Sequence, residues 1–229
     1  MVQAKKDGAC LIVHGFGGSP GEIEYLKKRL QMEGLDTYTA SLAGHGGTRK
    51  DLTASSYPDW IESVKTAINR LTPEYNSINL IGFSLGGLIC VHFASVEEVK
   101  KLVFINTPIR IWNFRLIFRD IISEFHGRKF DRIHYYKKSA SAISIKSGVD
   151  FLTILSKTKK MFKDVSKPSL ILQCRGDESA HYKSAGFIKE KLGDYGHLQY
   201  YEGGCHQVFT AAFDLRDKVC DDIYKFLVS

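Results

Sequence analysis

The sequence predicts an α/β fold with a mostly parallel sheet, helices on both of its faces and an inserted lid. Short apolar runs alternate with amphipathic helical segments along most of the chain, which is the pattern of βαβ units. Right-handed crossovers between parallel strands then place helices on both faces of the sheet. The 229 residues suit a single core, and the alternation is lost over residues 108–164. We therefore expect a core of residues 1–107 and 165–229, with residues 108–164 forming the lid.

Short apolar runs predict the strands of this sheet. Runs of this kind, bounded by polar residues or glycine, are typical of strands that are buried on both faces. The predicted strands are Cys10–Val13, Thr37–Ala40, Asn79–Phe83, Leu102–Ile105, Ser169–Cys174 and Leu198–Tyr201.

The first helix is predicted from its start signals. Ser19 is expected to be the N-cap, Pro20 fits the first helical position, and Glu22 would complete a capping box with Ser19. Ile23, Leu26 and Leu30 then form one apolar face. Further helices are expected at 58–71, 85–95, 179–192 and 214–228 in the core, and at 111–125 and 151–162 in the insertion.

The composition is that of an ordinary globular protein. Hydrophobic residues make up 44% of the chain and charged residues 25%, so disorder, collagen and coiled coil are not expected. No apolar run approaches the roughly 20 residues that span a bilayer. Met1–Gly8 is polar and charged, unlike a secretory signal, so we expect a cytoplasmic protein. The five cysteines are scattered without a CxxC pair, which argues against a disulfide framework and against a structural zinc site.

The positive charge is concentrated in the predicted insertion. The net charge of the chain is +7, and residues 108–164 contain 13 Lys/Arg against 5 Asp/Glu. Arg110, Arg115 and Arg119 could attract anionic fatty-acid products or make transient contact with a membrane, or they could form a solvated helix face. The apolar residues from 111 to 122 could line a channel for an acyl chain or could pack the lid on the core. No nucleic-acid recognition motif is present, so no nucleic-acid partner is expected.

Ser84 is the candidate nucleophile. It lies in Gly82-Phe83-Ser84-Leu85-Gly86, which fits the G-x-S-x-G pattern. An apolar strand precedes the pattern and a helix-compatible run follows at once, which is the context of a nucleophile elbow. The two glycines allow close backbone approach at a sharp turn, and the N-terminus of the following helix favours a developing oxyanion.

A serine hydroxyl needs a base to remove its proton, and eight histidines are available. In this type of fold the base follows the nucleophile and the acid in the chain. His206 lies after the last predicted strand and leads into the last helix, at the sheet edge where functional groups gather. His206 is therefore the candidate base, and His197 is the alternative.

The candidate acid lies after the strand at 169–174. Asp177 and Glu178 both follow this strand, and Asp177 is favoured. Its expected role is to hold the histidine tautomer and to stabilise the imidazolium without taking the proton.

The loop His14-Gly15-Phe16-Gly17-Gly18 follows the first strand and is the candidate oxyanion loop. Two backbone N–H groups must converge on the carbonyl oxygen as it becomes negative. We expect them to belong to Phe16 and to Leu85, the residue after the nucleophile. His14 is expected to be a structural hydrogen-bonding residue of this loop.

Five segments of the sequence resemble the small carboxylesterases and monoacylglycerol lipases of the α/β-hydrolase superfamily. They are HGFGGSP at 14–20, GHGG at 44–47, GFSLGG at 82–87, QCRGDESA at 173–180 and GGCHQVF at 203–209. The resemblance implies a triad of Ser84, Asp177 and His206, and an oxyanion hole formed by Phe16 and Leu85. It weakens over residues 109–163. Cys205 stands where the family usually has glycine, which could alter the packing of that loop.

We therefore expect a serine carboxylic-ester hydrolase that acts on short- to medium-chain acyl esters through an acyl-enzyme on Ser84. The chemistry needs no metal and no organic cofactor. A thioesterase or acyltransferase would use the same triad, and a monoacylglycerol lipase would differ only in substrate, so these alternatives stay open. A non-catalytic binding protein would have no need to keep all three residues. The sequence does not predict the natural substrate or the oligomeric state.

Overall fold

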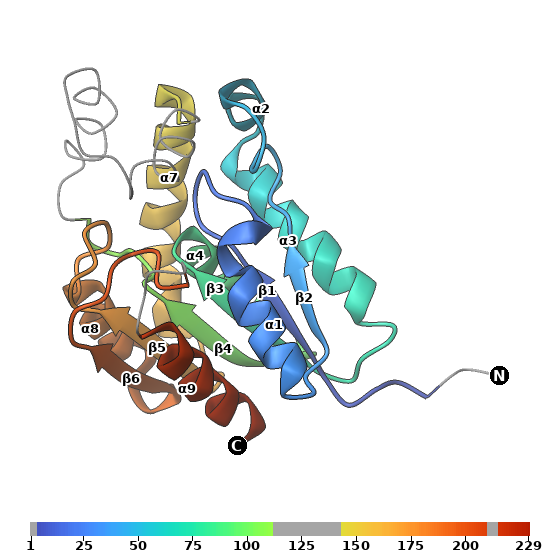
Figure 1. Ribbon diagram of the computed structural model, residues 1–229. Helices are drawn as coiled ribbons and strands as arrows, with labels where there is room; N and C mark the ends of the chain where they lie inside the picture. The colour runs from blue at the N-terminus through green and yellow to red at the C-terminus, as the bar shows by residue number, and fades with distance from the viewer. Residues whose placement is uncertain (1–3, 112–142, 210–214) are drawn as a thin grey trace.

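The computed structural model describes residues 4–111, 143–209 and 215–229, and they form one parallel sheet with helices on both faces (Figure 1). The strand order is β2-β1-β3-β4-β5-β6, and every neighbouring pair is parallel. The strands are β1 (Ala9–Val13), β2 (Thr37–Ala40), β3 (Ile78–Phe83), β4 (Val99–Ile105), β5 (Ser169–Cys174) and β6 (Gly196–Tyr201). The predicted fold class is confirmed, and each predicted strand lies within an observed one.

The helices divide between the two faces of this sheet. The helix α1 (Glu24–Met32) and the C-terminal α9 (Arg216–Val228) cover one face. The other face is covered by α3 (Tyr57–Leu71), α4 (Leu85–Val91), α7 (Ile145–Met161) and α8 (Lys183–Leu192). Shorter elements are η1 (Pro20–Ile23), α2 (Arg49–Ala54), η2 (Phe162–Asp164) and η3 (Gly193–Tyr195). Within the described ranges, no helix combines the length and apolar character needed to cross a bilayer.

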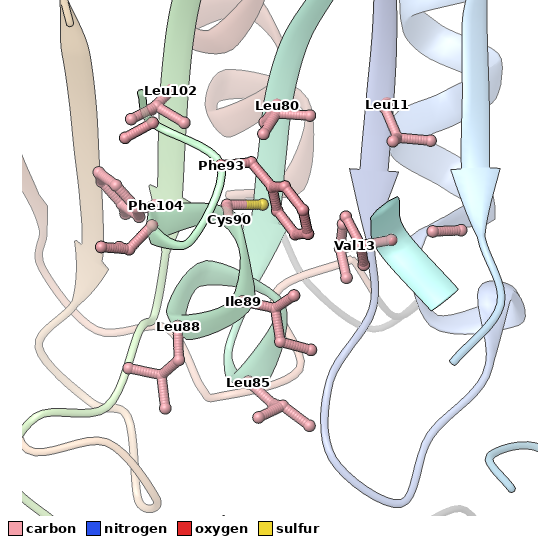
Figure 2. Close-up of a cluster of buried hydrophobic side chains, with 14 of the residues drawn as sticks. Leu11, Val13, Leu80, Leu85, Leu88, Ile89, Cys90, Phe93, Leu102 and Phe104 are labelled. Atoms are coloured by element: carbon pink, nitrogen blue, oxygen red, sulfur yellow. The ribbon is translucent and has the colours of Figure 1, made fainter. Parts of the chain in front are cut away.

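Alternation along the strands produces two hydrophobic clusters. Successive side chains of a strand point to opposite faces, so Leu11 and Val13 join the cluster beneath α4, whereas Cys10 and Ile12 join the cluster beneath α1 and α9. Figure 2 shows part of the first cluster, where side chains of α4 such as Leu88 lie among those of β1, β3 and β4. Burial on both faces explains why the central strands appear in the sequence as apolar runs, whereas the edge strands β2 and β6 are partly exposed and carry polar residues.

The described part of the predicted insertion includes α7. This helix begins at Ile145, six residues before the predicted start, because Ser144 caps it through the N–H of Ser147. Phe151 and Ile154 of α7 are buried in the cluster that also contains α4. The predicted helix at 111–125 lies almost entirely outside the described residues, as do most of the apolar and basic side chains discussed for the lid. The division of the chain at 108–164 therefore stays a prediction.

Two local expectations are wrong, and one helix was missed. The capping box at Ser19 does not form, because the chain makes a 3-10 turn there and the Glu22 carboxylate is used elsewhere. The helix predicted from residue 179 begins at Lys183, since the chain first wraps around Asp177 through the N–H groups of residues 179 and 180. The helix α2 was not predicted, and a capping box of Thr48 and Asp51 starts it.

The packing of α4 depends on a glycine. A Cβ atom added to Gly87 would lie 2.0 Å from Thr107 Oγ1, so the adjoining segment after β4 would have to move. We expect Gly87→Ala to destabilise the protein by about 1–3 kcal/mol through overpacking. The matched control is Gly186→Ala in α8, where the nearest atom is the Tyr200 hydroxyl oxygen at 3.5 Å. That change should be neutral or stabilise by up to about 1 kcal/mol. Thermal unfolding of both variants tests this, and equal midpoints would contradict the packing argument.

Candidate active site

Ser84 occupies a sharp turn between β3 and α4. Its φ is 52°, a left-handed backbone that a non-glycine residue rarely adopts. A Cβ atom on Gly82 would lie 2.3 Å from Gly87 N, and one on Gly86 would lie 2.2 Å from Val13 O. The turn is therefore possible only with glycine at these two positions. The N–H of Ser84 donates to the Ile105 carbonyl oxygen at 2.8 Å, which ties the turn to the end of β4.

The structure brings Ser84, His206 and Asp177 together in one hydrogen-bonded line. Ser84 Oγ is 2.9 Å from His206 Nε2, and His206 Nδ1 is 2.8 Å from Asp177 Oδ2. All three residues are buried. Because an ionised carboxylate only accepts, Nδ1 carries the proton and Nε2 of the neutral ring can accept from the serine hydroxyl. This arrangement can remove a proton from Ser84.

Asp177 accepts hydrogen bonds from the backbone of its own loop. Its Oδ1 accepts from the N–H groups of Ser179 at 2.8 Å and Ala180 at 2.7 Å. Glu178, the alternative acid, instead accepts from the backbone N–H of His206 at 3.1 Å. The two neighbouring carboxylates therefore differ in what they contact: Asp177 meets the imidazole ring, and Glu178 meets the peptide that carries it.

The charges around His206 favour its protonated form. Burial acts to lower the pKa of His206, but the carboxylates of Asp177, Glu178 and Glu22 act in the opposite direction and leave the pKa raised above its usual value. Asp177 contributes both charge and a hydrogen bond. The ring is thus better suited to take the serine proton than an isolated histidine would be.

The alternative histidine is not near this line. His197 lies within β6 and is exposed, and its ring faces Phe226 of α9 at a centroid distance of 6.4 Å. His14 is buried in the predicted oxyanion loop, where its Nδ1 donates to the Gly15 carbonyl oxygen and its Nε2 accepts from the Leu42 N–H. Burial lowers the pKa of His14 to about 3, so it stays neutral and structural.

The predicted oxyanion loop adjoins the turn at Ser84. A Cβ atom on Gly86 would lie 3.0 Å from the carbonyl oxygen of His14, so the start of this loop packs directly on the first turn of α4. Leu85 is the first residue of α4, and its N–H has no acceptor from a preceding helical turn. The Phe16 ring packs against Trp60 and Phe151, with centroid distances of 5.6 and 5.0 Å. The assignment of the Phe16 and Leu85 N–H groups to an oxyanion hole stays a prediction.

Asn106 supports the site and was not found from the sequence. Its side-chain nitrogen donates to the carbonyl oxygens of Cys205 at 3.2 Å and His206 at 2.9 Å, and its Oδ1 accepts from Cys174 N at 2.9 Å. It therefore joins the ends of β4 and β5 to the loop of His206. Its φ of 46° is in the left-handed region, which asparagine tolerates better than most residues. The sequence carried one signal for this role, because Asn106 directly follows the predicted strand at 102–105.

Among the described residues, no group of three or more His, Cys, Asp or Glu side chains could hold a metal ion. The side chains of Ser84, Asn106, Asp177 and His206 bond to one another and to backbone groups.

Comparison with known proteins places the chain in a family. Residues 9–130, more than half of the chain, match the family described as "alpha/beta hydrolase fold". The chain belongs to this family. The α/β-hydrolase is 25% identical to a carboxylesterase of Bacillus subtilis (strain 168), over 96% of this chain and 92% of that protein. It is 28% identical to a thermostable monoacylglycerol lipase of Bacillus sp. (strain H-257), over 44% of this chain and 41% of that protein.

A solved structure supports the same fold. The α/β-hydrolase superposes with a TM-score of 0.78 on one of the metagenome-derived lipolytic enzymes LipS and LipT, at 19% identity, covering 100% of this chain and 96% of that one. The resemblance to carboxylesterases and monoacylglycerol lipases that was found in the sequence motifs is thereby confirmed.

The contribution of Asn106 can be divided between backbone and side chain. We expect Asn106→Gly to destabilise the α/β-hydrolase by removing three hydrogen bonds, and Asn106→Ala to destabilise it by about 1–2 kcal/mol more, because alanine is strained at this φ. Denaturant unfolding of both variants measures the difference. If the alanine variant is as stable as the glycine variant, the left-handed backbone of this residue carries no strain.

Proposed function

We propose that this α/β-hydrolase is a carboxylic-ester hydrolase that acts on short- to medium-chain acyl esters through an acyl-enzyme intermediate on Ser84. The observation that carries the proposal is the line from Ser84 Oγ through His206 to Asp177, with distances of 2.9 and 2.8 Å. The similarity to a carboxylesterase along nearly the whole chain supports it.

The proposed reaction begins with attack by Ser84 Oγ on the ester carbonyl carbon. The hydroxyl proton passes to His206 Nε2, and Asp177 stabilises the resulting imidazolium without taking a proton. His206 then gives this proton to the leaving alcohol as the acyl-Ser84 ester forms. His206 takes a proton from a water molecule as its oxygen attacks the acyl carbon. The bond to Ser84 Oγ then breaks, His206 returns the proton to Oγ, and the acid is released. No metal or organic cofactor takes part in this sequence.

The tetrahedral oxyanion in both halves of the reaction needs two hydrogen-bond donors. We assign these donors to the backbone N–H groups of Phe16 and Leu85. The packing of the His14 peptide against Gly86 supports the assignment, because it brings the two segments together beside Ser84. Aromatic packing of Phe16 against Trp60 and Phe151 would keep its peptide in a fixed position.

A monoacylglycerol lipase is the second candidate, because part of the chain is 28% identical to such an enzyme. A thioesterase would use the same three side chains, so comparing thioesters with oxygen esters separates it from both. A non-catalytic binding protein is disfavoured, because binding alone would not need a base within hydrogen-bonding distance of Ser84.

We also assign the lid role to residues 108–164, with lipid-surface contact through their basic side chains. The segment carries a charge of +8, whereas the rest of the chain is close to neutral. The proposed compartment is the cytoplasm. All five cysteines lie in described residues and none of them forms a disulfide there, which suits a reducing environment.

The nucleophile can be tested with p-nitrophenyl esters of graded acyl length. We expect Ser84→Ala to lower kcat by about 10⁴-fold or more, because no other group can form the acyl-enzyme. The control is Ser41→Ala, which removes an exposed hydroxyl and should leave kcat unchanged. Release of p-nitrophenol gives the rates, and the optimum acyl length reports the depth of the acyl pocket. Equal turnover by wild type and Ser84→Ala would refute the role of Ser84.

The pH dependence should report the state of His206. Only the neutral ring can accept the serine proton, so kcat/KM should rise with pH through the raised pKa of His206. Asp177→Asn removes the nearest carboxylate, so the acid limb should move to lower pH while the plateau falls by about 10²–10⁴-fold. Asp194→Asn, at an exposed site, is the control and should change neither. If the acid limb of kcat/KM lies at the same pH in Asp177→Asn as in wild type, the electrostatic argument is contradicted.

A further inference from the structure

The carboxylate of Glu22 joins two loops of the candidate active site. Its Oε2 accepts from the backbone N–H of Gly15 at 3.0 Å, and its Oε1 accepts from Gln207 Nε2 at 3.0 Å. Glu22 is only 6% exposed, although it lies in the short η1 turn near the surface of the fold. A carboxylate in such a position loses most of its hydration, so its hydrogen bonds hold the surrounding loops strongly.

The oxyanion loop is shaped around this carboxylate. A Cβ atom on Gly18 would lie 2.2–2.3 Å from the carboxyl atoms of Glu22, and one on Gly15 would lie 3.3 Å from its Oε2. Side chains at these two positions would push the loop away from the carboxylate. The glycines of this loop therefore allow the backbone to close on Glu22 as well as to approach a substrate.

The two contacts of Glu22 are each one residue from a group that would take part in the reaction. Gly15 directly precedes Phe16, the assigned oxyanion donor, and Gln207 directly follows His206, the assigned base. A shift of the Glu22 side chain would therefore displace both segments together.

Glu22 also acts on His206 through its charge. Among the described residues, the charged groups that act on His206 are Asp177 and Glu178 from the loop after β5 and Glu22 from η1, and all three raise its pKa against the effect of burial. Asp177 bonds to the ring and Glu178 to the His206 backbone N–H, so Glu22 is the one of the three that approaches from the side of the oxyanion loop.

We propose that Glu22 is a positioning residue of this enzyme, whose carboxylate ties the oxyanion loop to the segment that carries His206. The inference rests on the proposed function and deepens it. Glu22 neither gives nor takes a proton in the reaction. It sets the distance between the donor of the oxyanion hole and the base, and its negative charge stabilises the imidazolium that forms when Ser84 loses its proton.

The test is Glu22→Gln, compared with wild type. Glutamine can still accept from the Gly15 N–H, and the Gln207 amide can turn to present its oxygen, so the shape of the site is kept while the charge is lost. We expect the acid limb of kcat/KM to move to lower pH, because a negative charge that raises the pKa of His206 is gone. We also expect kcat to fall by about 10- to 100-fold with little change in KM, since the oxyanion forms only in the transition state.

Glu24→Gln is the matched control, because it makes the same change two residues along the chain on a partly exposed side chain that pairs only loosely with Lys27 and Lys28. It should leave the pH limb and kcat as in wild type. General damage to the fold would lower the maximum of kcat/KM without moving the pH at which it rises. The position of this acid limb therefore separates a positioning role from a merely structural one.

A second variant acts on the other end of the contact. Gln207→Met removes the donor but leaves the Glu22 carboxylate, so kcat should fall while the acid limb stays close to that of wild type. NMR titration of the His206 ring in wild type and Glu22→Gln gives the change in pKa without relying on turnover.

The outcomes separate the inference from the proposed function. If wild type is active, the inference is overturned by an unchanged kcat or an unchanged acid limb in Glu22→Gln, or by an unchanged kcat in Gln207→Met, and the ester hydrolase still stands. A wild type that hydrolyses no ester or thioester overturns the proposed function. In that case, an unchanged pKa of His206 in Glu22→Gln overturns the inference as well. A lowered pKa of His206 in this variant supports the electrostatic effect of Glu22 on the ring.

Discussion

Parallel pairing of all six strands is the constraint on which the site depends. In a parallel sheet every strand ends at the same edge, so residues that follow different strands meet although they are far apart in the sequence. Ser84 follows β3, Asn106 follows β4, Asp177 lies after β5 and His206 lies after β6. The two hydrophobic clusters fix the sheet from both faces, which holds this edge rigid.

The second constraint is electrostatic, because three carboxylates lie around one histidine, and two of them, Asp177 and Glu22, are buried. Burial of a charge is costly unless hydrogen bonds replace its lost water. The backbone supplies these bonds to the two buried carboxylates: the N–H groups of residues 179 and 180 donate to Asp177, and that of Gly15 donates to Glu22. The N–H of His206 donates to the exposed Glu178. The loops are therefore shaped by the carboxylates, and the same carboxylates raise the pKa of His206. Loop conformation and base strength have a common origin.

The sequence predicted the features that depend on local pattern. Strands buried on both faces leave continuous apolar runs, and the order of nucleophile, acid and base limits the choice of histidine. Glu22 was assigned wrongly, because a Ser-x-x-Glu spacing looks the same whether the carboxylate caps its own turn or crosses to Gly15 and Gln207. Asn106 was missed because its role lies in contacts with residues about 70 and 100 positions away, which no local pattern records. The start of α8 was misplaced for a local reason: Asp177 accepts from the N–H groups two and three residues further along, in a turn that precedes the helix.

The strained backbone positions lie in and beside the candidate active site. Among the described residues, Ser84 and Asn106 are the two non-glycine residues with positive φ, and they end the neighbouring strands β3 and β4. Each is held by bonds that leave it little freedom: the Ser84 N–H bonds to the end of β4, and the Asn106 side chain bonds to β5 and to the His206 loop. Strain of this kind persists only where the surroundings over-determine the conformation. The close packing of Gly82, Gly86 and Gly87 supplies that over-determination on the side of Ser84. The packing of the core thus helps to keep the Ser84 hydroxyl facing His206 Nε2.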